Sequence, residues 1–487
     1  GIVDAGIQND HEDLSGKVFF PNAQSAADNN PYDDHGTHVA GIMGAIPNNN
    51  LGVTGILWNT IMYAYNWDTI DGTDAHLYAG LTDTVQAGAK VVNFSLGLAN
   101  DISGYGDPSV NQYVIDYAQQ SAGVMTPLLN AGYDFIVVES SGNGQNGYSQ
   151  DAIYNGYFCS VNYANCPGTT TMKNKINDRI LVVGNAQRTG TLAFQQYRSS
   201  NAGSQVDICA PGTDIWSCYA SDSYGYMTGT SMSSPLAAAV TALVWSVNPS
   251  LTGSQVRSLL LSNTSYTVAD NTSVYHPLVN TYPMVNAKLA VEAAIATVEP
   301  DYAAVDAAVA EANALNANLY TPGSWAALTA AVNAVDHNLT YLQQPQIDTM
   351  AANITGAIAG LVLKTVSYTV EYRLNAADGV KLAADKSASG QVTKTVTEQA
   401  VPVSGYTPVT AQKSLKLELE GNLIVFIYTD RPIFTLRLET LKESGGQLVS
   451  VATARAGDIL TVRVTPSTNF YCGSSRFIVM YDQNFYS

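Results

Sequence analysis

Short apolar runs alternate with segments of helical spacing through the first part of the chain. Six runs rich in branched and aromatic residues are predicted to be strands, at 1–3, 61–65, 91–95, 135–140, 180–184 and 206–210. Five segments between and after them are predicted to be helices, at 37–44, 75–87, 110–131, 236–247 and 254–261. This alternation favours an α/β fold, a mostly parallel sheet with helices on both faces.

Polar residues gather where the predicted strands end, which is where sheets of this kind bind their ligands. Asp4 closes the first strand, Ser95-Leu96-Gly97 closes the third, and Asn143 follows the fourth in the segment Ser141-Gly142-Asn143. The helix near residue 37 carries His35 and His38 at its start. Each residue alone also fits a turn or a helix cap.

A serine-rich segment, Gly229-Thr230-Ser231-Met232-Ser233-Ser234-Pro235, precedes the predicted helix at 236–247. A serine at the mouth of a helix lies where backbone N–H groups and the helix dipole favour negative charge, which suits a nucleophile that forms an oxyanion. The alternative is a plain N-cap, with Pro235 in the first turn.

Four of these residues together satisfy a known chemical requirement. A serine hydroxyl needs an imidazole to take its proton, and the imidazole needs a carboxylate to orient it. The developing oxyanion needs fixed hydrogen-bond donors, such as an asparagine side chain. Asp4, His35, Asn143 and Ser231 supply one group of each kind.

Residues 1 to about 296 resemble the catalytic domain of a subtilisin-like serine peptidase, a subtilase. The matching motifs are Ile2-Val3-Asp4-Ala5-Gly6-Ile7, His35-Gly36-Thr37-His38-Val39-Ala40-Gly41, Ser141-Gly142-Asn143 and Gly229 to Pro235, in the order Asp, His, Ser. The resemblance implies that Asp4 orients His35, that His35 is the general base, that Ser231 is the nucleophile and that Asn143 donates to the oxyanion. It also implies that His38 is structural.

The same resemblance implies a substrate cleft and a calcium site. Ser95-Leu96-Gly97 would pair with the substrate backbone as an added strand, and Ser140-Ser141-Gly142 would form part of the pocket for the residue before the scissile bond. Asp13, with Asn49 in the loop at 47–53, matches the family's structural calcium ligands. A polar turn without metal remains the alternative, and the chemistry itself needs no cofactor.

The composition changes abruptly at Val298-Glu299-Pro300, after a predicted peptidase domain at 1–297. Residues 301–364 have helical spacing, predict a short three-helix bundle and resemble FIVAR modules of bacterial surface proteins; a plain spacer is the alternative. Residues 366–430 predict a small β domain resembling MucBP modules. Residues 431–487 resemble the start of a cohesin-like β-sandwich.

Composition limits the classes of partner. The 487 residues carry a formal net charge of −18, which argues against nucleic-acid binding and fits a secreted or cell-surface location. No run of about 18 apolar residues predicts a membrane span. No signal peptide is visible, and the abrupt start at Gly1 predicts that the sequence is a fragment.

Five cysteines define no disulfide framework. Cys159 with Cys166, and Cys209 with Cys218, could each close a loop, and buried free thiols are the alternative. Cys472 has no evident partner.

The sequence therefore predicts a secreted or cell-surface bacterial serine endopeptidase that acts on proteins or peptides, with C-terminal modules that could bind a cell-wall or surface polymer. The rival hypothesis is an adhesin that keeps an inactive subtilase fold as a scaffold. A glycosidase would need paired carboxylates in a cleft, and no such pair stands out.

Overall fold

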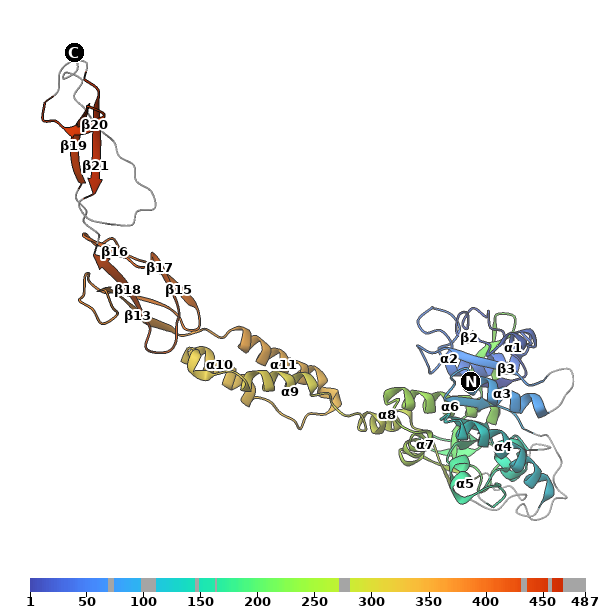
Figure 1. Cartoon of the computed structure of the whole chain (residues 1–487). Helices are drawn as coiled ribbons and strands as arrows, with labels where there is room; N and C mark the ends of the chain where they lie inside the picture. The colour runs from blue at the N-terminus through green and yellow to red at the C-terminus, as the bar shows by residue number, and fades with distance from the viewer. Residues whose placement is uncertain are drawn as a thin grey trace. The chain divides into compact units, whose positions relative to one another are not determined.

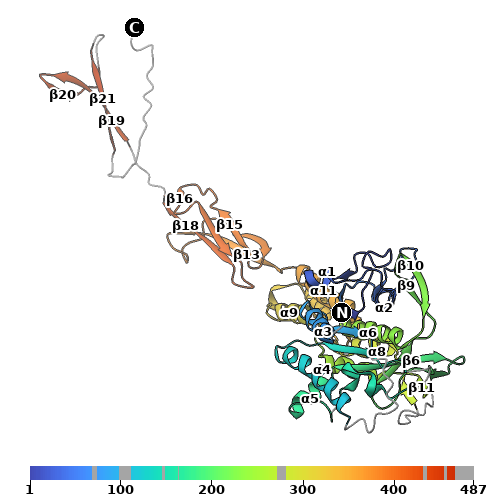
Figure 2. The same cartoon turned by 90° about the vertical axis from the view of Figure 1, so that its right-hand side faces the viewer.

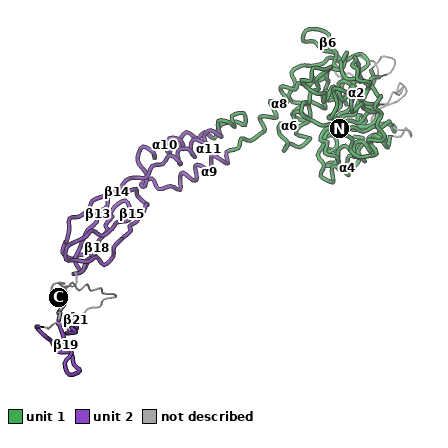
Figure 3. Tube along the Cα trace, turned by 90° about the horizontal axis from the view of Figure 1, so that it is seen from above, with its two compact units in different colours: residues 1–301, 337–346 green, residues 302–336, 347–487 purple. Residues whose placement is uncertain are grey.

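The computed structural model describes residues 1–68, 74–97, 111–144, 149–162, 164–270, 281–430, 436–453 and 458–466. The chain divides into two compact units, residues 1–301 with 337–346 and residues 302–336 with 347–487 (Figure 3). The polar segment at 100–108, where the sequence predicts an inserted loop near the substrate cleft, lies outside the described residues, as does Cys472.

A ten-stranded sheet forms the centre of the first unit. Its order is β12-β11-β7-β6-β5-β4-β1-β3-β2, with β8 also paired to β6, and the ladder from β2 to β6 and on to β8 is parallel throughout. The predicted mostly parallel sheet is confirmed. The strands are β1 (Ile2–Asp4), β2 (Val18–Phe19), β3 (Met62–Asn66), β4 (Val91–Phe94), β5 (Ile136–Ser140), β6 (Ile180–Arg188), β7 (Phe194–Gln196), β8 (Ile208–Pro211), β11 (Thr267–Ala269) and β12 (Thr281–Pro283).

Helices cover both faces of this sheet, because successive strand residues point to opposite sides and both sides are apolar (Figures 1 and 2). Ile2, Ile136 and Val138 pack with α2 (Asp34–Gly44), α6 (Thr230–Val247), α7 (Gly253–Ser262) and α8 (Ala287–Ile295). Val3 and Val137 pack with α3 (Asp74–Gln86), α4 (Gln112–Asn130) and α5 (Thr170–Asn177) on the other side. The short helix α1 (Ala23–Ala27) lies beside β3.

Helix α6 begins earlier than predicted, at Thr230 rather than at residue 236. Gly229 is the N-cap residue and makes no side-chain cap bond, so the reading of Ser231 as an N-cap is wrong; Ser231 lies inside the first turn. Among the described helices, only α6 is long and apolar enough to span a membrane, and 72% of that segment is buried inside the protein. Such burial is typical of a core helix.

The cysteines of the described residues are free thiols. Cys159, Cys166, Cys209 and Cys218 are all buried and unbridged, so the two candidate disulfides are wrong and the alternative of buried thiols is confirmed.

Among the described residues, the second unit contains two α-helices and most of a third, and strands follow them. The helices are α9 (Ala303–Asn313), α10 (Pro322–Asn333) and α11 (Gln344–Ala359). That they form an independent bundle stays a prediction, as do the exact domain boundaries. A small β domain follows, consistent with prediction, with strands β13 (Thr365–Leu374), β14 (Lys386–Gln391), β15 (Thr395–Gln399), β16 (Tyr406–Pro408), β17 (Gln412–Lys416) and β18 (Leu423–Asp430).

This β domain has its own core. Its four-stranded sheet has the order β14-β13-β18-β16, and Val370, Tyr372, Phe426 and Tyr428 are among its buried residues. Beyond it, β19 (Leu436–Ser444), β20 (Gln447–Ser450) and β21 (Leu460–Pro466) form a separate antiparallel sheet.

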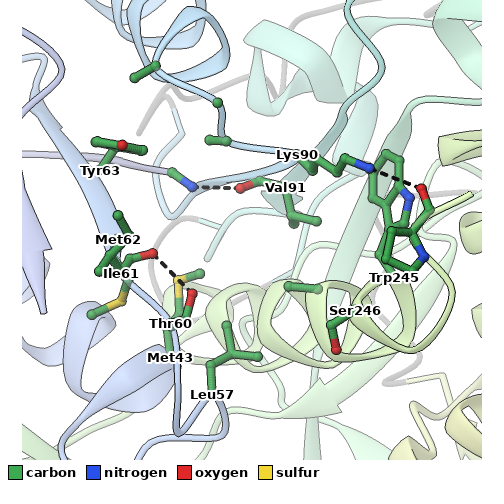
Figure 4. Close-up of a pocket in the computed structure, with 16 residues that line it drawn as sticks. Met43, Leu57, Thr60, Ile61, Met62, Tyr63, Lys90, Val91, Trp245 and Ser246 are labelled. Atoms are coloured by element: carbon green, nitrogen blue, oxygen red, sulfur yellow. Dashed lines mark hydrogen bonds between the residues drawn. The ribbon is translucent and has the colours of Figure 1, made fainter. Parts of the chain in front are cut away.

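A cavity of about 470 Å³ lies at the amino ends of the central strands. Gly1, Met62 and Val91, which precede or begin β1, β3 and β4, are among the lining residues (Figure 4). Lys90 closes one side, with its Nζ 4.7 Å from the centre of the Trp245 ring. Because the candidate catalytic residues follow the carboxyl ends of these strands, this cavity is not the predicted active site.

Helix α2 packs tightly on the hairpin of β9 (Ile215–Tyr219) and β10 (Ser223–Met227) through Gly41, where a Cβ atom would lie 2.3 Å from Ser217 Oγ. We expect Gly41→Ala to lower the free energy of unfolding by about 1–3 kcal/mol through overpacking. Gly123→Ala, on the exposed face of α4 with open space around it, should instead raise it by up to about 1 kcal/mol. Urea unfolding followed by tryptophan fluorescence measures both, and equal effects of the two substitutions would contradict the packing.

Candidate active site

Strand register brings the ends of the central strands to one edge of the sheet. Val3 is paired with Phe94, and Phe94 is paired with Glu139. The next residues, Asp4, Ser95 and Ser140, therefore lie side by side at the carboxyl ends of β1, β4 and β5. The structure thus places the polar residues that the sequence singled out on neighbouring strands.

A hydrogen bond joins Asp4 to His35, with 2.7 Å between Asp4 Oδ1 and His35 Nδ1. Asp4 is buried, and its Oδ1 also accepts the N–H of Ala5. His35 is the second residue of α2, whose N-cap is Asp33; the Asp33 carboxylate accepts the N–H of Gly36 at 2.7 Å. The helix start therefore fixes the imidazole against the end of β1.

The two histidines of α2 have opposite electrostatic surroundings. Burial lowers the pKa of His35, but the charge and hydrogen bond of Asp4, with a smaller contribution from Asp33, outweigh it and hold the pKa above its ordinary value. Burial lowers the pKa of His38 to about 4, and its Nε2 lies 2.9 Å from the carbonyl oxygen of Ile215. His38 is therefore neutral and forms a hydrogen bond with the backbone, which is typical of a structural residue.

Ser231 is held by the end of β4. Pro235 has no N–H, so the Ser231 carbonyl lacks its helical partner four residues on, and the Ser95 hydroxyl donates to that carbonyl instead at 2.8 Å. The Ser231 hydroxyl donates to the Ser95 carbonyl at 3.2 Å rather than to His35. A rotation about the Cα–Cβ bond of Ser231 is thus needed before its proton can pass to an imidazole.

Asn143 lies beside the start of α6. Its Oδ1 accepts the N–H of Thr230 at 2.9 Å and the Thr230 hydroxyl at 3.1 Å. With Oδ1 engaged as an acceptor, Nδ2 is left as the donor of this exposed side chain. A Cβ atom at Gly229 would lie 3.2 Å from Nδ2, so the glycine leaves room for the amide.

The two segments expected to bind substrate lie next to each other. The Ser140 hydroxyl donates to the Leu96 carbonyl at 3.1 Å, and the Ser141 hydroxyl donates to the Asn201 carbonyl at 3.0 Å. Gly97 is exposed at the end of one segment, while Gly142 is buried in the other. The hydrogen bond from Ser140 to Leu96 thus fixes the spacing of the two segments, and the bond from Ser141 to Asn201 holds the second segment.

The Asp13 carboxylate, the expected calcium ligand, is buried within the loop at 47–53. It accepts Asn49 Nδ2 at 2.5 Å, the Val53 N–H at 2.9 Å and the Tyr224 hydroxyl at 3.0 Å. Donors therefore satisfy both carboxylate oxygens. In the observed orientation, Asn49 directs Nδ2 rather than Oδ1 at Asp13, so it does not offer an oxygen ligand there. A rotation of the Asn49 amide by half a turn would direct Oδ1 to the same place. Asp13 and Asn49 would then supply two oxygen ligands of the kind that calcium prefers.

One supporting residue, Asn93, was not predicted from the sequence. Asn93, buried within β4, donates to the Ser95 hydroxyl at 2.9 Å and accepts the Ser234 hydroxyl at 2.7 Å. The sequence did show that a polar residue, Asn93, interrupts the apolar run Val91-Val92-Asn93-Phe94. That interruption could have indicated a buried polar contact. The hydrogen bond between Asn93 and Ser234 therefore joins β4 to the first turns of α6.

Comparison with known proteins agrees with this geometry. A sequence profile described as "Subtilase family" matches residues 1–289. Subtilisin DY of Bacillus licheniformis is 30% identical over 275 residues, covering 56% of this chain and 84% of that protein. Thermitase of Thermoactinomyces vulgaris is 30% identical over 250 residues, covering 50% of this chain and 73% of that protein.

One further sequence relative and one solved structure are also similar to this chain. Subtilisin E of Bacillus subtilis (strain 168) is 30% identical over 276 residues, covering 54% of this chain and 60% of that protein. A solved structure of a cold adapted subtilisin-like serine proteinase is 23% identical, with a TM-score of 0.40, and covers 58% of this chain and 88% of that one. On the family match and the sequence relatives, this chain belongs to the subtilase family and is a serine-type endopeptidase.

Proposed function

We propose that Asp4, His35 and Ser231 form the catalytic triad of this endopeptidase and that Asn143 completes the oxyanion hole. The observation that carries the proposal is the 2.7 Å hydrogen bond between Asp4 and His35, at the sheet edge where the end of β4 also holds Ser231. Helices α2 and α6, which carry His35 and Ser231, pack against each other. One edge of the sheet thus supplies the base, the residue that orients it and the nucleophile.

The chemistry proceeds through an acyl-enzyme. His35 Nε2 takes the proton of Ser231 Oγ as that oxygen attacks the substrate carbonyl, and Asp4 stabilises the imidazolium. Asn143 Nδ2 and the Ser231 N–H donate to the resulting oxyanion. The imidazolium then gives its proton to the leaving amine, and water hydrolyses the ester with His35 again as base.

Substrate binding would also release the nucleophile. The Ser95 carbonyl, which accepts the Ser231 hydroxyl in the free enzyme, lies on the segment proposed to pair with the substrate backbone. A substrate N–H bound to this carbonyl would compete with the hydroxyl for it. Ser231 would then be free to turn to His35.

Location and further partners are also proposals. A formal net charge of −18 and relatives from bacteria support secretion or display on a bacterial surface. The second unit, with its own β-sheet core, would then act as a spacer or bind a wall or surface polymer. An inactive subtilase scaffold in an adhesin is the rival, and peptide hydrolysis separates the two.

Replacing Asn143 tests the proposed oxyanion hole. Asn143→Leu removes the side-chain donor, so we expect kcat to fall about 10²–10³-fold, the loss typical of this substitution in a subtilisin, with little change in KM. Hydrolysis of a fluorogenic peptide by the full chain measures this.

Ser231→Ala should lose nearly all activity, while Ser246→Ala, on the exposed side of the same helix, should keep it. Wild-type protein without peptidase activity would support the adhesin.

The pH profile tests the electrostatics of His35. The imidazole must be neutral to accept a proton, and its pKa is raised, so activity should increase with pH along a limb that lies above the ordinary value of about 6.5. Asp33→Asn keeps a good N-cap but removes a charge, so the limb should move to lower pH. An unmoved limb in this variant would contradict the assignment of His35 as the base.

Calcium at Asp13 and Asn49 is proposed as structural, with no part in the chemical steps. Excess chelator should then lower the melting temperature of the wild-type chain, and added Ca²⁺ should restore it, because an ion bound to the native state stabilises it. Asp13→Asn should be insensitive to both. An unchanged melting temperature in the wild type would remove the calcium site and leave the hydrogen-bonded loop.

A further inference from the structure

The side chain of Asn155 lies between two glycines on opposite segments of the proposed substrate cleft. Asn155 ends the short 3-10 helix Ala152–Asn155 and is 2% exposed. A Cβ atom at Gly97 would lie 2.0 Å from Asn155 Oδ1, and a Cβ atom at Gly142 would lie 2.2 Å from the same oxygen. The amide therefore occupies the space that both glycines leave open.

Hydrogen bonds hold this amide in place from both sides. Asn155 Nδ2 donates to the carbonyl of Ser140 at 3.0 Å and to the carbonyl of Leu96 at 3.3 Å. One side chain thus bridges the segment after β4 and the segment after β5. Moving it out would leave a buried amide and two carbonyls without these bonds.

Further hydrogen bonds fix the two segments that Asn155 bridges. The Ser140 hydroxyl donates to the Leu96 carbonyl, which sets the spacing of the two segments at their base. The Asn201 N–H donates to the Gly142 carbonyl at 2.8 Å, which holds the second segment from behind. The segments therefore cannot separate easily to admit a larger group beside Asn155.

We propose that Asn155 closes the pocket for the substrate residue before the scissile bond and restricts that residue to a small side chain, glycine, alanine or serine. This inference rests on the proposed substrate cleft. Asn155 is a specificity-determining residue and takes no part in bond breaking. A large aromatic or aliphatic side chain would have to displace the bridging amide, whereas a methyl group or a hydroxymethyl group makes the least demand on the space that the amide occupies.

A buried carboxyl group lies beyond Asn155 and defines a competing outcome. Glu139 is fully buried in β5, and its Oε2 accepts the N–H of Cys159 at 2.6 Å. Cys159 Sγ in turn lies 3.8 Å from Asn155 Nδ2. If Asn155 moved aside, a lysine or arginine of the substrate could approach this carboxyl group, so a basic preference would contradict the closed pocket.

The test compares peptides that differ only in the residue before the scissile bond. Fluorogenic peptides with alanine, phenylalanine or lysine at that position are hydrolysed by the full-length wild-type chain, and kcat/KM is measured for each. We expect the alanine peptide to be preferred by about tenfold or more, since each misfitted group in a fixed pocket costs at least that factor. A preference for phenylalanine or lysine would overturn the proposal.

Substitution of Asn155 should then reverse the preference. Asn155→Gly and Asn155→Ala remove the amide, so kcat/KM for the phenylalanine peptide relative to the alanine peptide should increase about tenfold or more. Asn130→Gly, at the exposed end of α4, is the matched control and should leave the ratio unchanged. An unchanged ratio in an active Asn155 variant would overturn the assignment of Asn155.

Titration with a small serine-directed fluorophosphonate separates this proposal from the proposed triad. It counts the molecules with a reactive serine in each preparation, independently of the peptide series. Protein that is not titrated and cleaves no peptide contradicts the triad, whereas titrated protein with the wrong preference contradicts only the closed pocket. Should both Asn155 variants fail to fold, the wild-type preference alone decides.

Discussion

The anchoring of the first turn of α6 against the end of β4 is the constraint on which the site depends. Pro235 leaves the Ser231 carbonyl without its helical N–H, and the Ser95 hydroxyl fills that place at 2.8 Å. Asn93 holds Ser234 from the same strand. Because these groups are buried, losing one partner would leave an unsatisfied polar atom, a cost of about 1–3 kcal/mol. The position of the proposed nucleophile is therefore coupled to the stability of the sheet.

The same sheet edge positions the other groups. Parallel register places Asp4, Ser95 and Ser140 side by side, so groups far apart in sequence converge without a long loop to hold them. Asp4 is buried and His35 is only partly exposed, and their hydrogen bond lies where water screens it little. The raised pKa of His35 follows from this arrangement. Fold and reactivity thus share one cause, the alignment of strand ends.

The centre of the first unit could be predicted from the sequence, because the six predicted strands and five predicted helices have clear apolar patterns. The strands β2, β7, β11 and β12 were not predicted, because strands of two or three residues are too short to show a period. The helices α1, α5 and α8 were not among the predicted helices either. The start of α6 was misplaced since Gly229 to Ser234 has few apolar residues, although the backbone there is already helical and buried. Motif order predicted Asp4, His35, Asn143 and Ser231 as candidates. Periodicity could not predict that the Ser231 hydroxyl binds the Ser95 carbonyl, because this depends on a rotamer and a contact between distant segments.

The contacts of Asn155 and Asn93 could not be predicted from the sequence for the same reason, because both side chains contact segments that are distant along the chain. Nothing in the local pattern near residue 155 indicates that its amide meets Gly97 and Gly142, which lie 58 and 13 residues away by the numbering. Asn93 showed only that a polar residue interrupts an apolar strand. The free thiols also needed the fold, because cysteine spacing left pairing and burial equally open.

The most direct measurement of the central claim is the site of covalent labelling by a fluorophosphonate, mapped by peptide mass analysis of the folded full chain. The account predicts a single label on Ser231, formed at a rate that falls sharply in Asp4→Asn because His35 is then poorly oriented and less basic. A label on another residue, or none on folded and unblocked protein, would contradict the account.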